Sequence, residues 1–149
     1  MTAKLVTIAS GIVTALNGKT FSQTFTAARL WAPSSLRKDM SGYHVTIKPL
    51  YRITESPAIL TASNGYKVIL GIRTTSTALA DPTDFDPVAA LAEEVVDFLL
   101  GKTISGLYLT EVRGLSAEEM VEVGLWRETG LIALGYELTY TETADITAT

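Results

Sequence analysis

Apolar residues that recur at three- and four-residue steps mark the clearest helix of the chain, over Asp84–Gly101. Asp86 is placed to cap the first turn, and Pro87 then suits the first helical position, where its missing N–H costs nothing. Gly101 is placed to close the helix in a left-handed conformation. The predicted apolar face consists of Val88, Leu91, Ala92, Val95 and Leu99, and the opposite face carries Glu93, Glu94 and Asp97.

Helical spacing also appears near the start of the chain, over residues 3–17, with Asn17-Gly18 as a natural stop. Polar residues interrupt the apolar run, which falls short of the roughly 20 residues that a membrane span needs. We therefore interpret this segment as an amphipathic helix of the mature chain rather than as a signal sequence. Its apolar face consists of Leu5, Ile8, Ala9, Ile12, Val13 and Leu16.

Alternating patterns predict three strands between the two helices, over residues 21–31, 43–53 and 66–73. Pro49 lacks an N–H donor, so the second of these strands should be bulged there or lie at a sheet edge. Ser63-Asn64-Gly65 reads as a turn before the third strand, which is apolar enough for the middle of a sheet. The face predicted for the second strand comprises Val45, Ile47, Tyr51 and Ile53.

The remaining segments extend the sheet after the Asp84–Gly101 helix. Residues 74–83 form a polar loop before that helix, and residues 107–112 and 131–140 read as strands after it. A further strand over 120–127 competes with a short helix over 116–122, and residues 128–130 suit a hairpin turn. Residues 141–149 have few apolar side chains and are expected to be loose.

The order of elements predicts an α+β fold, an antiparallel sheet with both helices packed on one face. The chain has 149 residues and an apolar fraction of 47%, enough for one domain with a real core; residues 1–140 are expected to be folded. Its net charge of −4 does not suit an electrostatic nucleic-acid binder. The absence of cysteine and the single histidine exclude thiolate chemistry and multi-histidine metal centres.

No sequence motif names a reaction. Phosphate-binding loops, the dinucleotide fingerprint and the nucleophile elbow do not occur. His44 lies within a predicted strand and is best explained as an outward-facing polar residue. Asp81, Asp84 and Asp86 could bind a hard cation, but helix capping and the helix dipole explain them better. We therefore predict no catalytic residue, no metal site and no cofactor.

The order of elements resembles the tail terminator or tail-completion proteins of long-tailed bacteriophages, and the related neck proteins at the head–tail junction. The resemblance is architectural and covers roughly residues 3–140. It rests on an apolar strand, a central helix and a last strand with alternating apolar residues and an aromatic residue near its end. The corresponding residues are Val68, Ile69, Leu70 and Ile72, then Leu91, Val95 and Leu99, then Ile132, Leu134, Tyr136, Leu138 and Tyr140.

This resemblance implies a structural, non-enzymatic protein of the virion, assembled in the host cytoplasm. Such proteins form a ring, usually hexameric, that ends growth of the tail tube and presents a docking surface to the head–tail connector. The implied partners are other copies of the chain, the tail tube protein, the connector protein, and genomic DNA that passes through an acidic pore without specific binding. The alternatives are another connector or tube-associated protein, or a small-molecule-binding or hydrolytic α+β domain.

A ring needs two different complementary faces on each subunit. Trp31 and Trp126 could stack on nucleic acid but suit core or interface anchors better, and the only basic concentration surrounds Arg37 and Lys38. The candidates for subunit or pore contacts are Trp31, Arg37, Lys38, Arg73, Asp81, Asp84, Phe85, Glu93, Glu94, Asp97 and Trp126.

Overall fold

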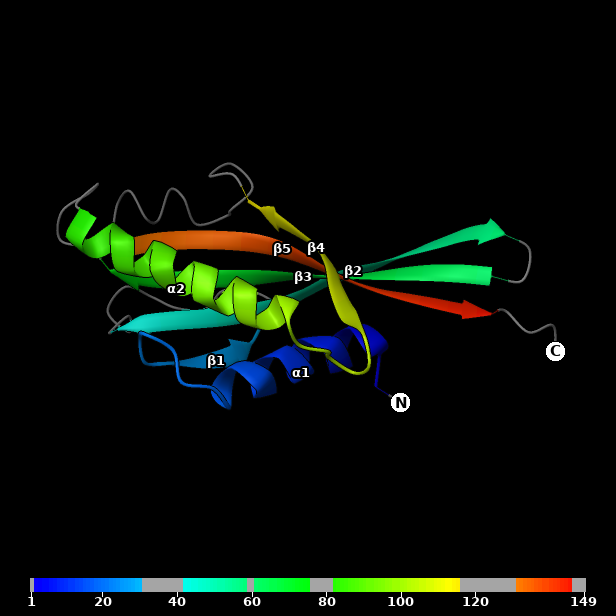
Figure 1. The fold of residues 1–149 in the computed structure, drawn as a ribbon, viewed down its shortest axis with the longest axis horizontal. Helices are drawn as coiled ribbons and strands as arrows, with labels where there is room; N and C mark the ends of the chain where they lie inside the picture. The colour runs from blue at the N-terminus through cyan, green and yellow to red at the C-terminus, as the bar shows by residue number, and fades with distance from the viewer. Residues whose placement is uncertain (1, 31–41, 59–60, 76–81, 116–130, 146–149) are drawn as a thin grey trace.

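A computed structural model describes residues 2–30, 42–58, 61–75, 82–115 and 131–145. Two helices and five strands follow one another in these residues (Figure 1). Their bounds are α1 (Lys4–Asn17), β1 (Phe25–Arg29), β2 (Tyr43–Ala58), β3 (Thr61–Thr75), α2 (Pro82–Leu100), β4 (Tyr108–Gly114) and β5 (Leu131–Asp145).

The five strands form one sheet in the order β1-β2-β3-β5-β4. β1 runs parallel to β2, and the other neighbouring pairs are antiparallel. β3 occupies the centre and pairs with β2, as its apolar sequence predicted. The α+β class is therefore confirmed, with one parallel pair in a mostly antiparallel sheet.

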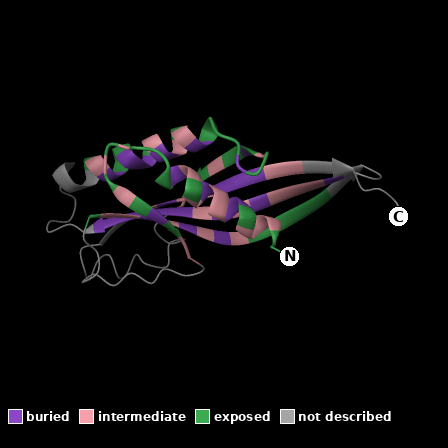
Figure 2. Ribbon diagram, turned by 90° about the horizontal axis from the view of Figure 1, so that it is seen from below, coloured by how far each residue is buried: buried purple, intermediate pink, exposed green. Residues whose placement is uncertain are grey.

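Both helices pack on the same face of the sheet, which we call the inner face. Buried residues line the sides of the helices and strands that meet there (Figure 2). The predicted apolar faces of both helices are confirmed, and Tyr66, Val68, Leu70 and Ile72 of the 66–73 strand are buried in the same core. The most deeply buried side chains include Ile8, Ile12 and Leu16 of α1, Val88, Leu91, Val95 and Leu99 of α2, and Ile47, Val68, Leu70, Ile72, Leu138 and Tyr140 of the sheet.

The ends of α2 differ from the prediction. The helix begins at Pro82, so Asp86 is an exposed residue within it rather than its cap, and Pro87 lies inside it. Pro82 suits the first position of a helix, whereas Pro87 is the sixth residue and removes an N–H that lies beyond the four without helical partners. Gly101 does not adopt the predicted left-handed conformation; instead the Lys102 N–H donates to the Leu99 carbonyl at 3.2 Å.

β2 runs past its predicted end and carries a bulge after Pro49. Pro49 pairs with Val68, but Tyr51 pairs with Lys67, which leaves Leu50 as the extra residue. The predicted bulge is confirmed. The sequence pattern did not show, however, that the bulge changes which face the following residues occupy. An extra residue exchanges the faces of the strand beyond it, so Tyr51 lies on the outer face, opposite the helices. The predicted common face therefore ends at the bulge, and Ile53 is exposed at 39%.

The predicted turn at Ser63–Gly65 is wrong, because these residues lie inside β3. Asn64 pairs with Thr54 and Gly65 pairs with Ile53. The Thr54 hydroxyl donates to the Asn64 Oδ1 at 2.8 Å, and the Asn64 Nδ2 donates to Glu142 at 3.3 Å. These bonds to β2 and β5 hold Asn64 in an extended strand, although asparagine followed by glycine favours a turn.

β1 is shorter than the predicted strand over 21–31 and forms one edge of the sheet. Asn17, the last residue of α1, covers that edge. Its Nδ2 donates to the Ala27 carbonyl at 3.1 Å, and its Oδ1 accepts from the Ala27 N–H at 2.7 Å. The side chain thus satisfies backbone groups that an edge strand would otherwise leave open.

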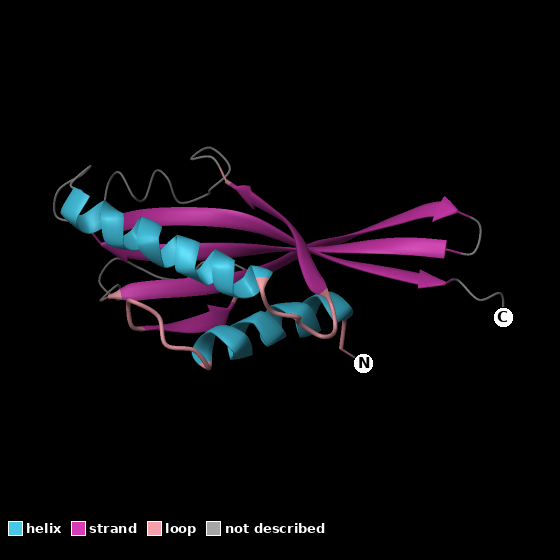
Figure 3. Cartoon of the chain, viewed as in Figure 1, coloured by secondary structure: helices cyan, strands magenta, loops and turns pink. Residues whose placement is uncertain are grey.

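β5 continues to Asp145, so the prediction of a loose segment after residue 140 is wrong for residues 141–145. Together with the distal halves of β2 and β3 it forms a three-stranded extension, which we call the arm: residues 51–58, 61–67 and 139–145. The arm projects past the helices (Figure 3). The predicted elements over 116–130 and most of the 74–83 loop lie outside the described residues. Neither described helix is long and apolar enough to cross a membrane.

Candidate functional site

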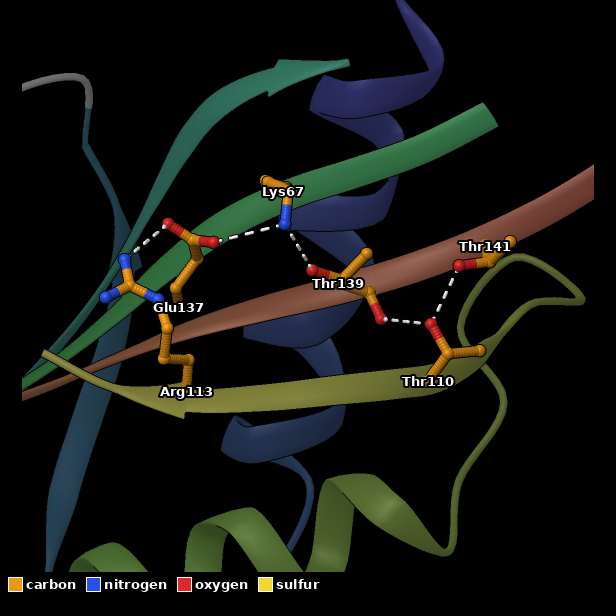
Figure 4. Close-up of polar contacts among 6 residues, drawn as sticks. All are labelled: Lys67, Thr110, Arg113, Glu137, Thr139 and Thr141. Atoms are coloured by element: carbon orange, nitrogen blue, oxygen red, sulfur yellow. Dashed lines mark hydrogen bonds and ion pairs between the residues drawn. The ribbon is translucent and has the colours of Figure 1, made fainter. Parts of the chain in front are cut away.

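The outer face of the sheet, which carries no described helix, is organised around Glu137 of β5 (Figure 4). Lys67 of β3 donates to Glu137 at 3.1 Å and to the Thr139 hydroxyl at 3.0 Å. Arg113 of β4 donates to the other Glu137 oxygen at 3.3 Å. Only 12% of the Glu137 side chain and 14% of the Lys67 side chain is exposed. One carboxylate therefore joins three neighbouring strands in a partly desolvated setting, where such bonds are stronger than at an open surface.

A bulge in β4 continues this polar strip. Leu109 pairs with Tyr140 and Glu111 pairs with Thr139, so Thr110 is the extra residue. The Thr110 hydroxyl bonds to the Thr139 carbonyl at 3.1 Å and to the Thr141 hydroxyl at 2.7 Å. The side chain thereby supplies a bond to β5 at the point where the bulge interrupts the ladder.

A shallow hollow of about 220 Å³ opens in the outer face at the base of the arm, and we call it the acidic trough. Gly65 forms part of its floor, where an added Cβ would lie 3.6 Å from the Thr139 Cγ2. Glu55 and Glu111 are exposed at its sides, and neither makes an ion pair with any described residue. Its complete lining is Ile53, Glu55, Ser63, Gly65, Lys67, Glu111, Thr139 and Thr141.

Large apolar side chains flank the trough. Tyr51 pairs with Lys67 and is 44% exposed, while Tyr108 pairs with Thr141 across the sheet and is 63% exposed. Aromatic side chains at a surface offer contact area at a low entropic cost when a partner covers them. The trough therefore combines two carboxylates that make no ion pair with a described residue and exposed tyrosines, a residue type that is enriched at protein interfaces.

A second and larger hollow, of about 720 Å³, lies in the helical layer, and we call it the basic groove. α1 gives it small residues on one side, and the chain that follows α2 forms the other. Lys19 and Lys102 both line it, and their ammonium groups lie 5.3 Å and 5.6 Å from the centre of the Phe98 ring. Its lining is Gly11, Thr14, Ala15, Gly18, Lys19, Thr20, Phe98, Lys102, Thr103, Ile104 and Ser105.

An aromatic cluster fixes the floor beneath these lysines. The Phe98 ring meets the Phe21 ring edge to face at 5.6 Å between centroids, and Phe21 lies 5.4 Å from Phe25. Glu94 of α2 accepts a bond from the Ser22 N–H at 3.1 Å and another from the Ser22 hydroxyl. The segment before β1 is therefore held against α2, which keeps Phe98 and its two cations in place.

The predicted contact residues are spread over the molecule. Trp31, Arg37, Lys38, Asp81 and Trp126 lie outside the described residues, and Asp84 and Phe85 belong to the first turn of α2. Arg73 is 3% exposed on the outer face and donates to the Thr46 hydroxyl at 3.1 Å. Glu93 and Asp97 are exposed on α2, whereas Glu94 is engaged by Ser22. Their roles at an interface stay predictions.

Two tyrosines have perturbed acidity. Burial raises the pKa of Tyr140, whose hydroxyl lies in the core without a hydrogen-bond partner among the described residues. Burial also raises the pKa of Tyr66, and a hydrogen bond at 3.1 Å to the Glu142 carboxylate adds to the shift. His44 lies on the outer face, as predicted, and is half-buried. In the described part of the chain, no three acidic or histidine side chains gather in a way that could hold a metal ion.

Sequence reasoning missed both hollows. The trough depends on the face exchange after Pro49 and on Gly65, which the pattern assigned to a turn. The groove brings together Lys19 and Lys102, which are far apart in the sequence. Each follows a different helix, and the sequence pattern does not show that the ends of these helices lie close together. A Gly-Lys pair after each helix, Gly18-Lys19 and Gly101-Lys102, was the one available signal.

No protein-family model matches the chain, and no curated protein matches it in sequence. Among solved structures, a sheath/tube terminator of an extracellular contractile injection system, PVC, in its extended state, is similar to the chain at 13% identity and a TM-score of 0.41. The match covers 100% of this chain and 62% of that protein, so the chain spans less than two thirds of its length. A likeness this distant carries no assignment of function.

Proposed function

We propose that the protein is a structural component of a phage-type virion. In this proposal it forms a ring, of six copies by analogy with the family it resembles, at the head-proximal end of the tail. The ring ends growth of the tail tube and joins the tail to the head connector. DNA passes through its pore without specific binding.

The arm is the observation that carries this proposal. Its strands extend past both helices, so the helices that cover the rest of the sheet do not cover its tip. A sheet with solvent on both faces buries little apolar surface and is marginal without a partner. Tyr51 and Ile53, exposed at 44% and 39%, stand on the outer face of the arm where a neighbouring subunit would bury them. An arm that needs a partner favours an assembly protein over an enzyme domain.

The experiment is assembly on tail tubes. Purified protein is added to growing tubes, and tube length and end structure are read by negative-stain electron microscopy. We expect added protein to stop tubes from growing and to leave a ring at one end. Tubes that grow equally long with and without the protein would refute termination.

A ring between tail and head could also serve as another connector or tube-associated protein, and the same images separate the two roles. A terminator binds the growing end of the tube in the absence of heads. A connector binds isolated heads or completed tails and leaves tube length unchanged.

A further inference from the structure

Unpaired charges of opposite sign lie on opposite faces of this molecule. Lys19 and Lys102 line the basic groove in the helical layer, and neither makes an ion pair with a described residue. Glu55 and Glu111 line the acidic trough on the outer face and are equally unpaired. The other charged residue of the trough, Lys67, is already bonded to Glu137.

We propose that the acidic trough of one copy docks on the basic groove of a second copy. The inference rests on the proposed ring and names the two surfaces that would build it. Because the trough and the groove are different surfaces, the contact is heterologous and repeats from copy to copy until the ring closes. Two carboxylates on one side match two ammonium groups on the other.

The shapes of the two surfaces suit this contact. Small residues, Ala15 and Gly18, lie on the α1 side of the groove, and its volume of about 720 Å³ has room for a protruding side chain. Tyr108 stands beside Glu111, with 63% of its surface exposed, and can enter the groove when the carboxylates reach the lysines. Aromatic anchors in pockets, ringed by polar contacts, carry most of the binding energy in protein interfaces.

The lysines are also prepared for binding. Both ammonium groups lie over the single Phe98 ring, at 5.3 Å and 5.6 Å from its centre. This contact limits the conformations of two flexible side chains before a partner arrives, which lowers the entropic cost of association. Carboxylates from a neighbour would complement the charge of both ammonium groups.

Reversing charges on one surface at a time tests the contact in the full-length protein. The trough variant is Glu55→Lys with Glu111→Lys, and the groove variant is Lys19→Glu with Lys102→Glu. We expect each variant alone to lose self-association, with at least about a tenfold rise in the dissociation constant, since like charges then face each other. Analytical ultracentrifugation over a range of concentrations measures this.

Mixing the two variants is the decisive step. The reversed trough of one variant complements the reversed groove of the other, and the remaining pair of surfaces is unchanged in sign. An equimolar mixture should therefore recover assembly, as should the quadruple variant that carries all four changes. Recovery also shows that each variant is folded. Asp86→Lys, at an exposed position of α2 that lines neither the trough nor the groove, is the control and should assemble like the wild type.

The remaining outcomes separate this inference from the proposed function. A wild-type ring that all variants still form overturns the docking surfaces and leaves the ring intact. Loss of assembly in one variant only, or no recovery on mixing, overturns the pairing and assigns the affected surface to another partner. A wild type that stays monomeric in solution and on tail tubes overturns the ring, and the docking inference with it.

Discussion

Gly11 shows how a single residue sets the distance between α1 and the chain that follows α2. An added Cβ at this position would lie 2.8 Å from the Cγ2 of Ile104, a side chain that is 3% exposed. Alanine normally stabilises a helix relative to glycine by about 1 kcal/mol. Here the clash outweighs that gain, because the buried isoleucine cannot move without disturbing the core.

We therefore expect Gly11→Ala to lower the free energy of unfolding by about 1–3 kcal/mol. Gly18→Ala is the matched control just after the same helix, where the new Cβ meets the Thr14 and Ala15 carbonyl oxygens at 3.4 Å and 3.7 Å and φ is −86°. Its effect should stay within about 0.5 kcal/mol. Urea unfolding followed by circular dichroism measures both, and equal effects at the two positions would contradict the close contact with Ile104.

Tyr140 carries a polar group that the core does not use. Its side chain is fully buried, and its hydroxyl has no hydrogen-bond partner among the described residues. Tyr140→Phe removes that group and keeps the ring, so we expect a gain of about 1 kcal/mol in the free energy of unfolding. A loss of stability, measured by urea unfolding, would mean that the hydroxyl is satisfied in solution.

The same variant should change the response to alkaline pH. Burial raises the pKa of Tyr140 above its value in the unfolded chain, 10.0, so above that pH the unfolded chain releases a proton that the folded protein keeps. Stability is therefore complete below about pH 10 and falls as the pH rises beyond it. Tyr140→Phe should flatten this fall, whereas Tyr108→Phe, at a position 63% exposed, should not. Unfolding curves between about pH 8 and about pH 11 make the comparison.

At the scale of elements, Glu137 joins β3, β5 and β4. Replacing it with alanine leaves Lys67 largely desolvated with one hydroxyl partner and removes one acceptor of Arg113. We expect Glu137→Ala to cost about 1–3 kcal/mol. Glu111→Ala removes an exposed carboxylate that makes no ion pair with a described residue, and it should change stability by less than about 0.5 kcal/mol. Thermal unfolding of the two variants measures this difference. Equal melting temperatures would contradict the role of Glu137 in joining the three strands.

Helices and strands were predicted correctly where apolar residues kept the same spacing over a whole segment. α1, the apolar face of α2 and the alternation of β3 follow directly from the sequence because each buries one regular stripe. Tyr51 was assigned to the wrong face because one extra residue after Pro49 reverses everything that follows. Asn64-Gly65 was assigned to a turn because local preference favours turns, while side-chain bonds to Thr54 and Glu142 hold it in a strand.

The candidate site was harder to predict than the fold. Glu93 and Asp97 stood out because they form an exposed stripe on one helix. The unpaired charges of the trough and groove belong instead to segments that only tertiary structure brings together. Charge pairing across strands, such as Lys67 with Glu137, leaves no periodic signal in a single sequence.

At the scale of the whole molecule, the arm should report assembly. An arm that lacks a partner opens easily, so its amides should exchange hydrogen quickly in dilute protein. We expect residues 51–58, 61–64 and 141–145 to become protected as concentration rises and the ring forms. The buried segment Val68–Ile72 at the centre of the sheet should stay protected throughout and serves as the internal reference. Hydrogen exchange read by mass spectrometry follows both, and an arm protected equally at all concentrations would contradict its need for a partner.

The position of β5 between β3 and β4 also sets the order in which the chain can fold. β2 and β3 are adjacent in sequence and can pair early, but the other side of β3 waits for β5, and the Lys67–Glu137 bond closes a separation of 70 residues. During synthesis the central strand therefore stays open on one edge until the end of the described chain has left the ribosome. Premature association of nascent chains along that edge is the hazard, and completion of β5 removes it.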